Sequence, residues 1–253
     1  MTKCPNALIA ALVYLIFTTP VGAADIKVLT AGAMKSVVLA LAPGFEQQTG
    51  HRLTIDQGTT GALLKRIGDG EPFDLAIITP AVIDELARQG KIVPASRSDI
   101  AKVGVGVAIK AGAALPDIAT VDAFKRTLLA AKSVAYIDPK AGGSSGIYFD
   151  QLLVKLGIAD AVRGKAVLKA GGYVAELVVN GEAEIAVHQI SEILPVTGAT
   201  LVGPLPHDIQ NYTVYAAGVA TAAADGAAAK SLVAYLTSDT AKAILKAKGM
   251  QNP

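Results

Sequence analysis

The chain has 253 residues, of which 52% are hydrophobic and 17% charged, and 23 basic residues against 21 acidic ones give a formal net charge of +2. This balance, with 5% aromatic residues and no tryptophan, argues against a nucleic-acid partner, because basic clusters and stacking side chains are both lacking. Three dispersed histidines and a single cysteine give no spacing for a zinc site, so we expect no metal and no cofactor.

The N-terminus has the order of a secretory signal peptide. Lys3 precedes an apolar run at residues 7–17, and the small residues Ala23 and Ala24 follow a helix-breaking Thr-Thr-Pro segment. The alternative, an uncleaved anchor, is disfavoured because a membrane-spanning helix needs about 20 apolar residues. We therefore expect residues 1–24 to be a signal peptide cleaved near Ala23 or Ala24, and the mature chain to be a soluble periplasmic protein.

The rest of the chain begins with an alternation of short strands and longer helical segments. The strands are rich in β-branched and aliphatic residues, a pattern typical of an α/β fold with mainly parallel sheets. Strands are predicted at 26–30, 52–56 and 73–78, and the helices that follow them at 34–48, at 62–67 and from Pro80 onward. These three units predict one lobe.

A second series of elements starts with a strand at 103–109. Strands are predicted at 133–137, 166–169, 184–188 and 212–216. Helices are predicted at 121–131 and 173–179, and a further helix begins within 138–145 and ends at 156. Two Ala-rich helices, at 226–236 and 240–248, end the chain. Because no linker separates the two series, we expect strands that cross between two lobes: lobe 1 at 25–102 plus 217–253, and lobe 2 at 103–216.

Four strand-to-helix turns consist mainly of small residues. They lie at 30–34, 57–61, 142–146 and 170–173. A helix N-terminus exposes unpaired N–H groups and a positive dipole end, so such turns can hold an anion without Lys or Arg. Any one of them is an ordinary cap or tight turn. Four of them at the carboxyl ends of strands in two lobes predict an anion site, to which Thr59, Thr60, Ser144 and Ser145 add hydroxyl donors.

Several of these segments carry a family resemblance. They are residues 26–34, 58–63, 73–78, 138–139 with 145–148, and 184–188. In this order they resemble the periplasmic molybdate-binding proteins of ATP-driven importers over essentially the whole mature chain. The resemblance implies a two-lobed α/β periplasmic binding protein fold of type II, in which each lobe is a mixed, mainly parallel sheet flanked by helices. It also implies capture of a small oxyanion such as molybdate for an ABC permease in the inner membrane, without catalysis.

The resemblance also implies ligand contacts position by position. It puts a hydroxyl donor at Thr60 and an amide donor at Ser145. The family's first-turn serine falls on Ala33, its later tyrosine on His188, and a usually small aliphatic position on Tyr173. These departures leave a different oxyanion or a small organic carboxylate open as the ligand. We expect the ligand to be bound by Ala33, Met34, Thr59, Thr60, Ser144, Ser145, Tyr173 and His188.

His188 has two interpretations. At the end of an apolar strand it can donate a hydrogen bond to an anion, and its protonation would make affinity depend on pH. Alternatively, local backbone satisfies it, as buried polar groups require. We favour the ligand contact because of the positional match.

Two further function classes compete with a binding protein. Residues 142–146 match G-x-S-x-G, the turn that exposes the serine of a hydrolase, but Pro139 interrupts the connection from the strand, so we disfavour a serine hydrolase. A periplasmic sensor built on the same fold remains an alternative, since a fold does not fix a function. We expect a monomeric binding protein that is not an enzyme.

Overall fold

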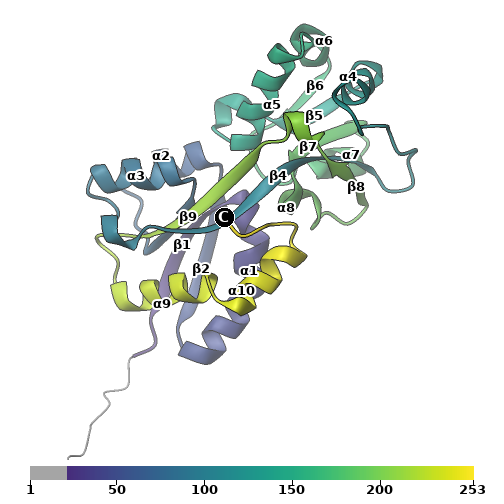
Figure 1. Ribbon diagram of the computed structural model, residues 1–253. Coiled ribbons are helices and arrows are strands. Elements are labelled where there is room, and N and C mark those ends of the chain that lie inside the picture. Colours follow the sequence, from purple (N-terminus) through teal and green to yellow (C-terminus); the bar gives the residue numbers. More distant parts are fainter. Residues whose placement is uncertain (1–21) are drawn as a thin grey trace, which may run out of the picture.

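Two long strands, β4 (Ser98–Lys110) and β9 (Tyr212–Val219), connect the two lobes of the protein in the computed structural model, which describes residues 22–253. The lobes lie at opposite ends of this antiparallel pair (Figure 1). The apolar run and most of the predicted signal peptide lie outside the described residues. The crossing strands give the two-lobed α/β architecture expected from the sequence.

The first lobe is built on a sheet with the strand order β2-β1-β3-β9-β4. Its own strands are β1 (Asp25–Ala31), β2 (Arg52–Gly58) and β3 (Leu75–Ile78). These three are parallel, and β9 joins them in antiparallel orientation beside β3. The carboxyl ends of β1 and β2 therefore lie at one edge, where each strand passes into a helix.

Five helices surround the first sheet. They are α1 (Gly32–Thr49), α2 (Thr60–Gly68), α3 (Pro80–Arg88), α9 (Gly226–Leu236) and α10 (Asp239–Ala247). The last two pack against α1, so the end of the chain returns to the first lobe. Within residues 22–253, no helix combines the length and apolarity needed to cross a membrane.

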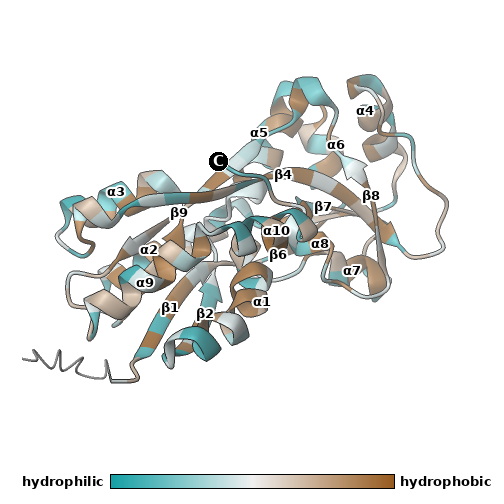
Figure 2. Cartoon of the chain, turned by 60° about the horizontal axis from the view of Figure 1, so that its bottom comes forward, coloured by the Kyte–Doolittle hydropathy of each residue, from teal (hydrophilic) through white to brown (hydrophobic). Residues whose placement is uncertain are grey.

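Helix α1 shows why these sequences fold as they do. Met34, Val37, Leu41 and Phe45 recur at a spacing of three or four residues, and all four are buried against the first sheet. The helix stops at Gly50, whose φ of 75° suits glycine and whose amide donates to the last turn. In Figure 2, hydrophobic residues are concentrated along the strands and hydrophilic residues mainly on outer helices and loops.

The second lobe continues the sheet in the order β4-β7-β5-β6, with β8 on the other side of β4. Its strands are β5 (Val134–Ile137), β6 (Ala166–Lys169), β7 (Ile185–Gln189) and β8 (Ala199–Pro204). Its helices are α4 (Val121–Ala130), α5 (Ser144–Lys155), α6 (Ala159–Arg163), α7 (Ala175–Val179) and α8 (Ile190–Ile193). Strands β5, β6 and β7 are parallel, so their carboxyl ends also share one edge.

The buried side chains form separate cores. One core draws on residues 26–103 and 215–250, and the other two clusters draw on residues 105–209. The lobe limits at 102/103 and 216/217 stay a prediction, because they fall inside β4 and β9. These two strands pair with each other, and each also pairs with a strand of one lobe: β9 with β3 and β4 with β8.

Some elements differ from the sequence prediction. Helix α1 begins at Gly32, directly after β1, so no separate turn precedes it. Helices α6 and α8 and strand β8 were not predicted. Helices of four or five residues are too short to show a hydrophobic period. Strand β4 is longer than expected because its first half pairs with β9, outside the second lobe.

Candidate functional site

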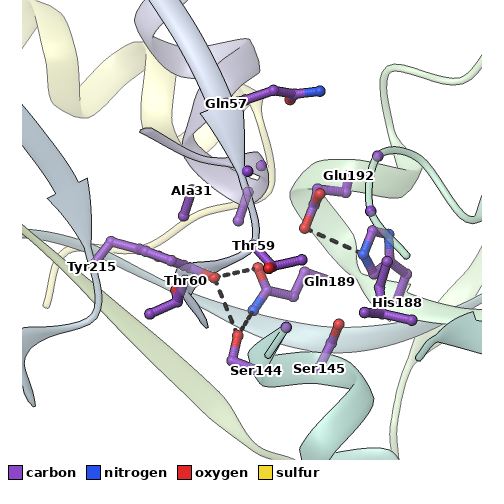
Figure 3. A pocket seen from close by; sticks show the side chains of 17 residues that line it. Ala31, Gln57, Thr59, Thr60, Ser144, Ser145, His188, Gln189, Glu192 and Tyr215 are labelled. Carbon is purple, nitrogen blue, oxygen red and sulfur yellow. Dashed lines mark hydrogen bonds and ion pairs between the residues drawn. The ribbon is translucent and has the colours of Figure 1, made fainter. Parts of the chain in front are cut away.

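A cavity lies between the lobes, where strand ends from both meet (Figure 3). Its volume is ≈ 30 Å³, which exceeds the roughly 10–15 Å³ that one water needs on the same measure. It is lined by residues 31–33, 57–60, 143–145 and 171–172 together with Ile137, His188, Gln189, Glu192 and Tyr215. All four small-residue turns thus contribute residues to the lining of one cavity.

Two helix N-termini open into the cavity without a side-chain cap. Helix α1 starts at Gly32 and helix α5 at Ser144, and the residue before each makes no capping hydrogen bond through its side chain. The first N–H groups of a helix have no partner within the helix, and the dipole is positive there. Both ends can therefore donate to an anion. At α2, by contrast, Thr59 accepts a hydrogen bond from the amide of Ala62 at 3.1 Å.

Two hydroxyl groups lie at the starts of α2 and α5, on Thr60 and Ser145. The residues Thr60 and Ser145 are 9% and 3% exposed, and neither hydroxyl bonds to another residue drawn in Figure 3. Among the described residues, no Lys or Arg lines the cavity. The donors that face the cavity are therefore backbone amides and neutral side chains.

A closed group of three polar side chains forms one wall. The hydroxyl of Tyr215 donates to Gln189 Oε1 at 2.7 Å, and Gln189 Nε2 donates to Ser144 Oγ at 2.8 Å. The two hydroxyl oxygens of Ser144 and Tyr215 are 3.4 Å apart. Burial raises the pKa of the Tyr215 phenol, so the group keeps its proton.

The ionisable pair of the site is His188 and Glu192. His188 lies near the end of β7, and Glu192 lies four positions later in the short helix α8. The Nε2 atom of His188 is 3.3 Å from Oε2 of Glu192. Burial lowers the pKa of His188 to about 3, with the charge of Lys169 as a smaller cause, and raises the pKa of Glu192 to about 8. At neutral pH the histidine is uncharged and the glutamic acid is mostly protonated. We therefore describe the contact as a neutral pair, because burying two charges without further partners is costly.

The surroundings of this pair place Glu192 between the lobes. A Cβ atom on Gly32, the first residue of α1, would collide with Glu192 Oε1. The carboxyl group of a second-lobe helix therefore lies against a first-lobe helix N-terminus. His188 Nδ1 is buried and has no hydrogen-bond partner among the described residues.

The lobes touch directly at the rim of the cavity. The amide of Gly61 donates to the carbonyl oxygen of Gly142 at 3.1 Å, and the hydroxyl of Thr59 donates to the carbonyl oxygen of Ala141. These bonds join the turn at 57–61 in the first lobe to the start of the turn at 142–146 in the second lobe. The structure thus shows the lobes closed over the cavity.

Six of the eight residues predicted from the sequence line this cavity, namely Ala33, Thr59, Thr60, Ser144, Ser145 and His188. Met34 does not, because it is fully buried in the first core. Tyr173 lies in a separate surface hollow, where the Lys35 ammonium is 5.8 Å from its ring centroid. Neither residue lines the cavity between the lobes.

Gln57 lines the cavity as part of the predicted turn at 57–61, although it was not among the predicted ligand contacts. Sequence reasoning missed three further polar residues of the cavity wall: Gln189, Glu192 and Tyr215. Gln189 is the last residue of β7 and Glu192 lies in α8, the helix that follows it, and the i, i+4 spacing of His188 and Glu192 was the available signal. Tyr215 lies within β9, where no feature of the sequence separates it from an ordinary core tyrosine.

Comparison with known proteins gives matches over nearly the whole chain. The family model described as bacterial extracellular solute-binding protein matches residues 26–251. The aconitate isomerase of Pseudomonas sp. is 32% identical over 253 residues, which cover 96% of this chain and 94% of the relative. The molybdate-binding protein ModA of Azotobacter vinelandii is 28% identical over 238 residues, or 90% of each chain.

Solved structures confirm the two-lobed type II fold. The periplasmic molybdate-binding protein of Azotobacter vinelandii has a TM-score of 0.78 at 24% identity and covers 90% of this chain and 99% of its own. The sulfate-binding protein SubI of Mycobacterium tuberculosis has a TM-score of 0.73 at 16% identity, with coverage of 90% and 87%.

One of these findings corrects the sequence analysis. We expected a protein that is not an enzyme, and this expectation is wrong, because a relative with 32% identity over 96% of the chain bears the name of an isomerase. The expectation came from the resemblance to oxyanion carriers, and the His188–Glu192 pair is the feature of the cavity that it did not account for.

Proposed function

The chain belongs to the family of bacterial extracellular solute-binding proteins, of the ModA type, and from this premise we propose that its cavity isomerises a small unsaturated polycarboxylate such as aconitate. The observation that carries the proposal is Glu192, a buried carboxyl group on the cavity wall, paired with a neutral histidine and with a pKa near 8. A carrier of oxyanions needs only donors. A proton-transfer group between two helix N-termini adds the means for chemistry.

The reaction needs no cofactor and no redox change. Aconitate carries a methylene group next to one carboxylate and a carbon–carbon double bond next to the others. A base removes a methylene proton, the electron pair forms a new double bond to the central carbon, and the old double bond opens toward its far carbon. Return of the proton to that far carbon gives the same compound with a new double-bond geometry. One C–H bond is broken and one is formed.

Glu192 suits both proton transfers. General acid–base catalysis works best when the pKa of the group lies near the working pH, so that both protonation states are populated. With a pKa of about 8, Glu192 is partly ionised near neutral pH and can accept the proton, then return it. His188 Nε2, 3.3 Å away, holds the carboxyl group in place.

The helix N-termini supply the other requirement of the reaction. Removal of the methylene proton places negative charge on the neighbouring carboxylate, and fixed donors aimed at that charge lower the barrier. Because Glu192 lies against Gly32 at the start of α1, a carboxylate bound to that N-terminus would present its adjacent carbon to the base. Thr60, Ser144 and Ser145 would bind the remaining carboxylates.

The test is an isomerisation assay. The exported chain, mixed with cis-aconitate and followed by proton NMR, is expected to produce the trans isomer and to reach the same mixture from either side. The Glu192→Gln variant is expected to bind aconitate and to isomerise it about 10²-fold to 10⁴-fold more slowly, the usual contribution of a general base. No conversion by the wild-type protein above the rate in buffer would refute the proposal.

A second candidate function is uptake. We propose that the protein also captures a small anion in the periplasm, after its signal peptide is removed near Ala23 or Ala24, and delivers it as a monomer to an ABC permease in the inner membrane. Family membership and the contacts between the lobes support this role. A sensor function would use the same cavity.

Ligand screening separates these candidates. Molybdate, tungstate, sulfate, phosphate, aconitate and citrate are each added in a thermal-shift assay, where a ligand at a hundredfold excess over Kd adds roughly 2.7 kcal/mol to the stability of the folded state. Stabilisation by molybdate, without isomerisation of aconitate, would favour the carrier. N-terminal sequencing of the protein from a periplasmic extract tests the cleavage site.

A further inference from the structure

The group of Ser144, Gln189 and Tyr215 has a fixed direction of hydrogen bonding. Its members come from the start of α5, the end of β7 and the middle of β9, so it links the cavity wall to a strand that connects the lobes (Figure 3). An amide oxygen only accepts and an amide nitrogen only donates. Tyr215 therefore gives its proton to Gln189 Oε1, and Gln189 Nε2 gives one to Ser144 Oγ.

This direction leaves one hydrogen without a good partner. Ser144 Oγ already accepts from Gln189, so its own hydrogen must point elsewhere. Within the group it can reach only the Tyr215 oxygen at 3.4 Å, well beyond the usual O–H···O distance. The remaining direction is the cavity, which Ser144 lines.

We propose that Tyr215 and Gln189 are positioning residues that hold the Ser144 hydroxyl as a donor toward the ligand, so that this end of the cavity selects a carboxylate or another anionic acceptor. The inference rests on the proposed anion-binding function of the same cavity. Hydrogen bonds to a charged acceptor are shorter and about twice as strong as neutral ones. A ligand group that only donates would leave the Ser144 hydrogen unpaired and be rejected.

The substitution Tyr215→Phe tests the direction without removing Ser144. Because phenylalanine has no hydroxyl to donate to Gln189 Oε1, the Gln189 amide can rotate by half a turn and accept the Ser144 hydrogen on its oxygen. The Ser144 hydroxyl then no longer donates to the ligand. We expect the Kd for trans-aconitate and for molybdate, measured by calorimetry, to rise about 10-fold to 100-fold, the range for a lost hydrogen bond to a charged group.

A double-mutant cycle distinguishes positioning from general damage. Ser144→Ala is expected to weaken binding as much as Tyr215→Phe. The Kd of the double variant should not exceed the higher of the two single-variant Kd values, because both substitutions remove the same donor. Ser144→Thr keeps the hydroxyl and is expected to stay within about threefold of wild-type affinity, far less than the loss of a bond to a charged group. The matched control is Tyr212→Phe, an exposed tyrosine of the same strand, which should leave both Kd values unchanged.

Each outcome decides the inference. Wild-type affinity in Tyr215→Phe, or losses that multiply in the double variant, would overturn it, and so would a wild-type protein that binds neither probe. Anion binding without isomerisation would refute the proposed reaction alone, and the affinities in the cycle would still decide the role of Tyr215. Thermal unfolding of each variant shows that it is folded before its Kd is compared.

Discussion

The backbone amide of Gly61 donates to the backbone carbonyl of Gly142 at 3.1 Å, and this bond joins the two lobes at the rim of the cavity. A Cβ atom on Gly61 would lie 2.9 Å from Gly142 Cα, and one on Gly142 would lie 2.7 Å from Gly61 Cα. Gly142 also has a backbone φ of 73°, a value that residues other than glycine rarely adopt. The lobes can approach this closely because neither turn carries a side chain at the contact.

Substitution of Gly61 by alanine should therefore hold the lobes apart. We expect Gly61→Ala to weaken anion binding about tenfold or more, because lobes held apart cannot both donate to one ligand and a lost hydrogen bond to a charged group costs about 1.5–3 kcal/mol. Small-angle scattering should also show a larger radius of gyration in the presence of aconitate. Gly68→Ala, in the same helix and with no atom within 4 Å of the added Cβ, is the control. A closed, tightly binding Gly61→Ala protein would contradict this account of closure.

Substitution of Glu192 by glutamine should separate binding from catalysis. The amide keeps the shape of the protonated carboxyl group but cannot take a proton, so kcat is expected to fall about 10²-fold to 10⁴-fold. KM for aconitate should change little, since the anion donors remain. Steady-state kinetics followed by NMR or absorbance measures both. The exposed Glu182→Gln variant should behave as wild type, and a Glu192→Gln enzyme of full activity would exclude Glu192 as the base.

The same pair should shape the dependence of stability on pH. Folding raises the pKa of Glu192 from an ordinary value of 4.5 to about 8, so between these values the folded state holds an extra proton and the free energy of unfolding falls as pH rises. Folding lowers the pKa of His188 from 6.5 to about 3, so between these values the free energy of unfolding rises with pH. The two effects oppose each other between pH 4.5 and 6.5.

Denaturant unfolding across this range tests the expected profile. The contribution of the pair should rise between pH 3 and 4.5, stay level to 6.5 and fall between 6.5 and 8. Glu192→Gln cannot ionise, so the decline between pH 6.5 and 8 should be reduced in that variant relative to wild type. Identical slopes for the two proteins in this interval would mean that Glu192 does not hold its proton there.

The hydroxyl groups of Thr60 and Ser145 should contribute to anion binding independently of catalysis. Thr60→Val and Ser145→Ala each remove one donor to a charged ligand, so we expect Kd values about 10-fold to 100-fold higher in calorimetry with aconitate. Thr54→Val, on the exposed face of the neighbouring strand, is the matched control for shape and should bind as wild type. Unchanged affinity in both site variants would place the ligand elsewhere.

The family resemblance and the fold could be read from the sequence because they rest on local patterns. The resemblance to molybdate-binding proteins is confirmed by the ModA relative and by the structural match to a molybdate-binding protein. The period of the strands and helices, the Pro at the start of α3 and the small residues in the turns are all visible along the chain. Lobe limits and ligand contacts remain predictions.

The contents of the cavity wall could not be read in the same way. Ser144 and Gln189 are 45 positions apart and meet because α5 packs against β7 in the second lobe. Tyr215 is 71 positions from Ser144 and reaches the same wall from β9, the strand that crosses between the lobes. Met34 carries the same lesson in reverse. It is the last residue of the predicted turn at 30–34, but it lies in α1, which directs its side chain into the core.

The sequence by itself determined the alternation of strands and helices, and with it the small turns that leave backbone donors at helix starts. Only the tertiary structure decided the ionisation of His188 and Glu192, because their pKa values are moved mainly by burial. Burial depends on what the second lobe and helix α1 place around them, and residues close along the chain do not show this. The same closure brings Gly61 to Gly142 and makes one cavity of four separate turns.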